Sequence, residues 1–132
     1  MKKVSLLLLL IILATAGYFY FDTAPQKKHK KKHNEKYYQT QLCDELDGVM
    51  EKRLPDRTRV DCLTDEYAIE VDFAKKWAEG VGQSLYYAEM TEKKPAVGLI
   101  VRDNKKDKRH MKRLKILADK YGITIFEIER GE

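Results

Sequence analysis

The chain has 132 residues, of which 36% are charged and 43% are hydrophobic. This length fits one globular domain, and this composition excludes both a fully disordered polymer and a polytopic membrane protein. The formal net charge is +5, but residues 1–36 alone carry +6 and the remainder carries −1. A phosphate backbone would therefore have to be recognised by local patches or by the N-terminal segment.

The N-terminal segment begins with Lys2 and Lys3 and continues with the uncharged residues 4–21. This pattern predicts a hydrophobic helix that is either a signal peptide or a single membrane anchor, and we give it the bounds 1–22. The small residues at 14–16 suit signal cleavage. The aromatic run that follows them suits a membrane interface and favours an uncleaved anchor. Both interpretations stay open.

Residues 23–36 are rich in lysine and predict a solvated basic linker near anionic lipid headgroups. His29 and His33 have helical spacing, but the ammonium groups around them disfavour a metal ion. The side of the membrane is ambiguous. The positive-inside rule draws the following domain towards the cytoplasm, whereas a Sec-type signal sends it outside. We predict that the domain lies outside the cytoplasm in a bacterial envelope.

The domain, residues 37–132, is predicted to be an α/β unit with a mixed sheet and helices on both faces. Asn34 is a predicted helix cap, and Gly122 is a predicted helix C-cap. The clearest alternation runs from Tyr67 to Phe73, with apolar residues on one face and acids on the other. The expected order is α-β-β-β-α-β-α-β, with helices over 34–47, 75–90 and 107–121 and strands over 49–54, 59–64, 67–73, 96–101 and 123–129.

Acidic side chains gather on the three consecutive predicted strands. Period two places Glu70 and Asp72 side by side on one face, although neighbouring anions repel each other. Asp61 lies on the preceding antiparallel strand, and Glu51 lies on the strand before that. Carboxylates from adjacent strands can converge on a hard divalent cation, so all four residues are candidate metal ligands. The competing interpretation is ordinary solvent exposure.

The helix after these strands predicts the second half of a site. At 100° per residue, Lys76, Gly80, Gln83 and Tyr87 share one polar edge, separate from the apolar stripe that starts at Trp77. The glycine would let another group approach closely. The alternative is that this edge is simply solvated.

These residues, in this order, resemble the PD-(D/E)xK nuclease superfamily. The matching segments are 59–61, 69–72 and 83–87, and the Gln-x-x-x-Tyr spacing of Gln83 and Tyr87 is similar to that of the RecB-like branch. The resemblance implies a restriction-endonuclease-like fold, with Asp61 and Glu70 as the metal-binding pair and Glu51 as a further acid. The family's lysine two residues after the second acid is Asp72 here. Some members carry that lysine on the following helix, where Lys76 stands.

The resemblance implies metal-dependent phosphodiester hydrolysis of DNA. Mg²⁺ or Mn²⁺ would be the cofactor, Lys76 would stabilise developing charge, and Gln83 and Tyr87 would line the site. The basic helix over 107–121 and the lysines before it could hold a phosphate backbone, or could be a solvated face. The alternative function is a non-catalytic envelope protein that uses the same fold for binding or structure.

The chain has two cysteines, Cys43 and Cys62. With only His110 left in the domain, four zinc ligands are not available. Two buried thiols are one expectation. In an exported domain, a disulfide from the first helix to the central hairpin is the other.

Overall fold

The computed structural model describes residues 32–131, and its first helix, α2 (Glu35–Glu45), begins at the predicted cap. The side chain of Asn34 accepts a hydrogen bond from the main-chain N–H of Tyr37 at 3.1 Å, which satisfies a donor that the helix leaves free. The helix ends two residues before its predicted end. Its buried residues include Tyr38 and Leu42, which pack on the sheet.

Three antiparallel strands follow in a meander: β1 (Val49–Arg53), β2 (Arg59–Leu63) and β3 (Tyr67–Phe73). Each lies within one residue of its predicted bounds. The Asp56 carboxylate accepts the main-chain N–H of Thr58 at 3.0 Å, which fixes the turn between β1 and β2.

Two helical crossover connections complete the sheet, because β3, β4 and β5 run parallel and are joined by helices. The side chain of Asn104 accepts from the N–H groups of Lys106 and Asp107 at 2.9 Å, so the last helix begins earlier than the predicted residue 107. That helix ends at Gly122, whose φ of 67° suits glycine.

The elements that follow β3 are the 3-10 turn η1 (Ala74–Lys76), α3 (Trp77–Thr91), β4 (Lys94–Val101), α4 (Lys105–Tyr121) and β5 (Thr124–Glu129).

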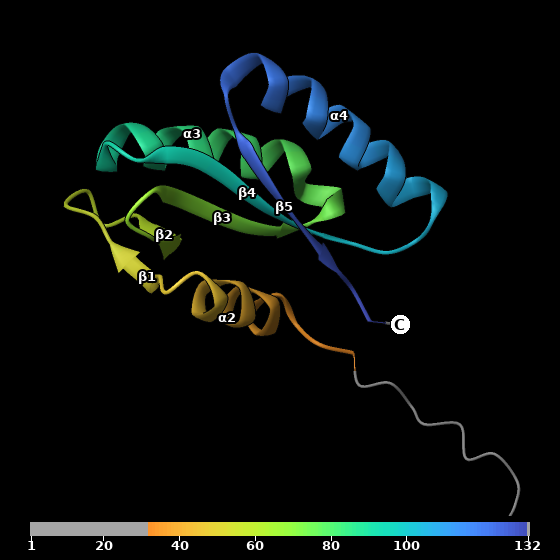
Figure 1. Cartoon of the computed structure of the whole chain (residues 1–132), viewed down its shortest axis with the longest axis horizontal. Coiled ribbons are helices and arrows are strands. Elements are labelled where there is room, and N and C mark those ends of the chain that lie inside the picture. The colour runs from red at the N-terminus through yellow and green to blue at the C-terminus, as the bar shows by residue number, and fades with distance from the viewer. Residues whose placement is uncertain (1–31, 132) are drawn as a thin grey trace, which may run out of the picture.

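The sheet has the order β1-β2-β3-β4-β5 and separates two apolar layers. Helix α2 covers one face, where Ile69, Val71 and Ile100 are buried. Helices α3 and α4 cover the other face, over Val97 and Leu99 (Figure 1). The predicted α/β class, element order and two-sided helical cover are confirmed.

The predicted N-terminal hydrophobic helix, residues 1–22, and most of the predicted linker lie outside the described residues. Within residues 32–131, no helix is both long enough and apolar enough to cross a membrane.

A disulfide joins Cys43 of α2 to Cys62 of β2, and both residues are fully buried. The bridge fixes the helix to the central hairpin across 19 residues of chain. Gly48 lies against it: a Cβ there would stand 2.8 Å from the Cys43 Sγ and closer still to the Cys62 Sγ. The glycine is therefore required by close approach.

We expect Gly48→Ala to lower the free energy of unfolding by about 2 kcal/mol, because the added methyl overpacks a buried bridge. Urea denaturation monitored by circular dichroism measures the change. Gly82→Ala is the matched control, since nothing lies within 4 Å of a Cβ at Gly82. Equal stability of the two variants would contradict the proposed contact.

Candidate functional site

Strand β3 carries Glu70 and Asp72 into the interior beneath α3. Their side chains alternate with the apolar residues that face α2, as the sequence predicts. Glu70 is only 6% exposed and Asp72 only 2%. The prediction that they share a face is thus matched by the structure, and the competing interpretation of ordinary solvent exposure is wrong for both.

Asp61 lies where β2 separates from β3. The ladder between these strands pairs Cys62 with Ile69 but does not continue to the next pair. Instead, the Asp61 Oδ2 accepts the main-chain N–H of Val71 at 2.9 Å. A carboxylate thus takes the place of a main-chain acceptor, and this brings Asp61 to the side of β3 that carries Glu70.

Glu51 lies opposite Asp61 on β1, where the β1–β2 ladder also omits a pair. Its φ of 52° is in the left-handed region, which costs a residue with a side chain about 1 kcal/mol or more. Its carboxylate is 2.8 Å from the Lys36 Nζ and 2.9 Å from the Arg59 Nη1. These cations and a hydrogen bond from Gln39 lower the pKa of Glu51.

Gln39 connects this outer acid to the strands. It is 4% exposed, and its Nε2 donates to the Glu51 Oε1 at 3.1 Å and to the Asp61 main-chain oxygen at 2.8 Å. Sequence reasoning missed Gln39. The signal was available, because its neighbour Tyr38 and Leu42 mark the buried face of this helix.

Among residues 32–131, Lys76 is the one cation that forms an ion pair with the buried acids of β3. Its Nζ is 2.9 Å from the Asp72 Oδ1 and 3.7 Å from the Glu35 Oε2. The lysine side chain is 40% exposed, so it reaches the acids from the rim. Glu35, the first residue of α2, is a second residue that sequence reasoning missed, because an acid in the first turn of a helix is common for electrostatic reasons alone.

Gln83 and Tyr87 follow Lys76 on α3, as the helical spacing predicts. The Gln83 Nε2 is 3.5 Å from the Tyr87 Oη, and the tyrosine is buried against Val60 and Ala68. Burial raises the pKa of Tyr87, and the nearby charges of Glu70 and Asp61 add to this. At Gly80, a Cβ would lie 3.6 Å from the Asp72 Oδ2, an ordinary contact distance.

The carboxyl groups of this cluster are close together and buried, and both conditions disfavour their charged forms. Burial, with the charges of Asp61 and Asp72, raises the pKa of Glu70 to about 9. Burial also raises the pKa of Asp61 to about 6, against the hydrogen bond from Val71. It raises that of Asp72 to about 6, against its bond to Lys76. At neutral pH, Glu70 is therefore protonated.

The donor chemistry of the cluster suits a hard divalent cation. The Glu70 Oε2 and the Asp72 Oδ2 are buried and have no hydrogen-bond partner within the described part of the chain. Mg²⁺ and Mn²⁺ prefer carboxylate oxygens of this kind. Among residues 32–131, however, no three acid, histidine or cysteine side chains stand together as a ready metal-holding group. Of the four predicted ligands, Asp61 and Asp72 act electrostatically on Glu70, whereas Glu51 is paired with Lys36 and Arg59.

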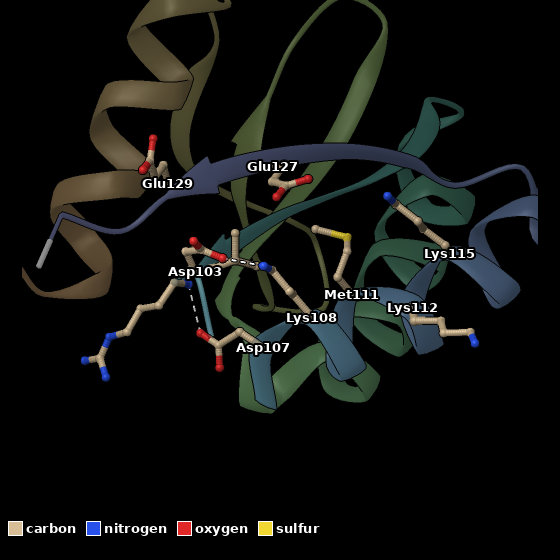
Figure 2. Close-up of a pocket in the computed structure, with 10 residues that line it drawn as sticks. Asp103, Asp107, Lys108, Met111, Lys112, Lys115, Glu127 and Glu129 are labelled. Atoms are coloured by element: carbon tan, nitrogen blue, oxygen red, sulfur yellow. Dashed lines mark hydrogen bonds and ion pairs between the residues drawn. The ribbon is translucent and has the colours of Figure 1, made fainter. Parts of the chain in front are cut away.

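A separate cavity of about 850 Å³ lies between the first half of α4 and β5 (Figure 2). Its charged lining is balanced, with four cations and four acids. Lys108 is paired with Asp103, and the Asp107 carboxylate accepts the main-chain N–H of Arg102. The basic run of α4 is therefore partly offset by acids from β5 and from the preceding loop.

Comparison of the chain with models of protein families, with curated proteins and with solved structures gives no match. What the site does must be inferred from its own residues.

We expect Glu70→Gln to stabilise the metal-free protein increasingly above pH 5. The folded pKa of about 9 exceeds the ordinary 4.5, so the folded state binds the proton more tightly. The contribution of Glu70 to the free energy of unfolding is therefore complete at low pH and is lost as the pH rises towards 9. One pKa unit corresponds to about 1.4 kcal/mol, so at pH 7 the wild-type glutamate lowers the free energy of unfolding by about 3 kcal/mol relative to its value at low pH.

Thermal unfolding in EDTA between pH 5 and 9 measures this difference, with Glu127→Gln as the control on an exposed glutamate of β5. Parallel profiles for wild type and Glu70→Gln would contradict the raised pKa.

Proposed function

We propose that the chain is a metal-dependent phosphodiesterase that cleaves DNA, with a restriction-endonuclease-like fold and a displaced lysine. The proposal is supported above all by the two buried, unpartnered carboxylate oxygens of Glu70 and Asp72 beside Lys76. Burying crowded acids is costly, and a protein retains such a cluster where the charge has a use. The order and spacing of the acids, the lysine and the Gln-x-x-x-Tyr pair support the same conclusion.

In this proposal, Asp61, Glu70 and Asp72 would hold Mg²⁺ or Mn²⁺, and the proton that Glu70 carries in the metal-free protein would be released when the ion binds. The ion, when bound, polarises a phosphate oxygen and lowers the pKa of a water molecule. Lys76 stabilises negative charge that develops on the phosphate. Its ammonium group lies at the exposed rim of the site, where it is beside the acids and open to a substrate. Tyr87 and Gln83 line the side of the site that α3 forms, and Val60 and Ala68 pack in the same apolar cluster as Tyr87.

The hydrogen bond from Gln39 to the Asp61 main chain keeps β2 in place while the Asp61 carboxylate turns towards β3. Gln39 and Glu35 are therefore positioning residues in this proposal: the first acts on Asp61, and the second shares Lys76 with Asp72. The strained backbone of Glu51 fits a rigid outer support for the same strands.

A non-catalytic envelope protein with the same fold is the second candidate. One observation favours it: the Asp61 carboxylate is engaged by Val71, and one oxygen of Asp72 is engaged by Lys76. A network that only stabilises the fold would use these contacts in the same way. Direct assays of cleavage and metal binding separate the two candidates.

We expect the purified full-length chain to cleave DNA only with Mg²⁺ or Mn²⁺, and Glu70→Gln to reduce the rate about 100-fold or more. The substrates are single- and double-stranded oligonucleotides, and cleavage is followed on denaturing gels. Glu127→Gln, a matched loss of an exposed carboxylate, should retain the wild-type rate.

Cleavage that is unaffected by Glu70→Gln would remove this residue from the mechanism. A wild-type chain that neither cleaves DNA nor binds Mn²⁺ in a titration followed by electron paramagnetic resonance would favour the non-catalytic candidate.

We further propose that the domain is tethered to a membrane by residues 4–21, or exported, and lies outside the cytoplasm. The disulfide between Cys43 and Cys62 supports this compartment, because such bridges persist where the environment is oxidising.

Cells expressing the chain, quenched with a thiol-alkylating reagent, should yield a protein that incorporates no reagent until it is reduced. Mass spectrometry of Cys43 and Cys62 measures this. A fully alkylated pair before reduction would place the domain in a reducing compartment. The Gly48→Ala variant, handled in the same way, reports whether a strained bridge still forms.

A further inference from the structure

A second cavity, of about 500 Å³, lies at the carboxyl ends of the parallel strands β3, β4 and β5. It is formed by the residues that directly follow these strands, by the start of α4 and by the chain before α2. Its cationic lining residues are Lys32, Lys75, Arg102, Lys106 and Arg130.

The charge in this cavity is strongly one-sided. Five cations line it, against the single acid Asp107. The Asp107 Oδ2 already accepts the main-chain N–H of Arg102 at 2.9 Å. None of the five cations has an ion-pair partner among residues 32–131. The larger cavity along α4 has equal numbers of both signs, so the basic run of α4 alone does not explain the difference.

The cavity also has an apolar wall. Phe73 and Ile100 line it, and the Arg130 guanidinium lies 4.5 Å from the centre of the Phe73 ring. The main-chain N–H of Arg130 donates to the Val101 oxygen at 2.7 Å, which holds this residue at the cavity. Cations beside an aromatic ring and a stacked guanidinium suit a nucleotide, whose phosphate and base need these two kinds of surface.

The cavity is next to the carboxylate cluster in the chain. Asp72 belongs to the cluster and Phe73 to the cavity, while Lys75 lines the cavity and Lys76 contacts the cluster. Each site also includes a residue near the start of α2. There Lys32 lines the cavity, and Glu35, three residues later, is 3.7 Å from Lys76.

We propose that this basic cavity binds a phosphate-bearing nucleotide of a DNA strand that extends from the carboxylate cluster. The inference rests on the proposed function and adds a second contact for the same substrate. Each phosphate neutralised by these cations releases counterions, so binding here is salt-dependent. The favoured ligand is nucleic acid rather than a lipid headgroup, because the cavity offers an aromatic ring with a stacked guanidinium and adjoins, along the chain, the cluster proposed to act on DNA.

The test measures binding without cleavage. Fluorescence anisotropy of a labelled single-stranded oligonucleotide, in EDTA, is followed for the full-length chain and for Lys75→Gln/Lys106→Gln. Both lysines are exposed, so the fold should be unaffected. We expect about 10-fold weaker binding and a salt dependence reduced by about two phosphate contacts. Arg130→Gln is a second, independent variant and should weaken binding in the same direction.

Lys93→Gln/Lys120→Gln is the matched control, because Lys93 directly precedes β4 and Lys120 lies in the last turn of α4, so neither is at the carboxyl ends of the strands. It should change the affinity less than about 2-fold if binding is local. Equal weakening by the control and by the cavity variants would overturn the proposal, since it would indicate diffuse attraction. Binding of vesicles with 20% anionic lipid that is lost in the cavity variants, with DNA binding unchanged, would also overturn it.

The same measurement on Glu70→Gln separates this inference from the proposed function. Retained DNA binding without cleavage supports both. Cleavage by Glu70→Gln at the wild-type rate, with binding lost only in the cavity variants, would reject the carboxylate mechanism and leave the cavity assignment intact.

Discussion

The third strand is covered by helices on both faces, and this double burial governs the rest of the molecule. Its apolar residues pack against α2, which a strand tolerates at no cost. Its other face carries Glu70 and Asp72 under α3, where two carboxylates are taken out of water and close to each other. The protein compensates only partly: Lys76 pairs with one oxygen of Asp72, and Glu70 keeps its proton at neutral pH.

That arrangement explains several features that are unusual when taken singly. The β2–β3 ladder stops where the Asp61 side chain takes the Val71 N–H, and the β1–β2 ladder omits the pair at Glu51, whose backbone is left-handed. Gln39 reaches both places from α2. The disulfide then fixes the same helix to β2. The part of the sheet that holds the acids is thus braced by α2 from the opposite face, and the acids cannot separate without moving a packed helix.

The end of β3 divides two environments of opposite charge. Asp72 and Lys76 belong to the acidic cluster, whereas Phe73, Ala74 and Lys75, which lie between them in the chain, line the basic cavity. Period two in the strand separates Asp72 from Phe73, and the 3-10 turn that follows carries residues of both sites. A substrate that carries phosphates and coordinates a cation would be able to contact both environments at once.

Local chemistry allowed much of this to be predicted. Period two gave the shared face of Glu70 and Asp72, and helix geometry put Gln83 and Tyr87 one turn apart on α3, although Lys76 lies in the 3-10 turn before that helix and not on it. Asn34 and Gly122 marked helix ends, because a cap depends on neighbours within a few residues. Tertiary structure alone decided which acids are buried. It also decided that Glu51 pairs with Lys36 and Arg59, and that Glu35 and Gln39 contact the cluster. It also gathered five cations from separate segments into one cavity. Burial and pairing depend on elements far apart in the chain, and periodicity carries no information about which of them will meet.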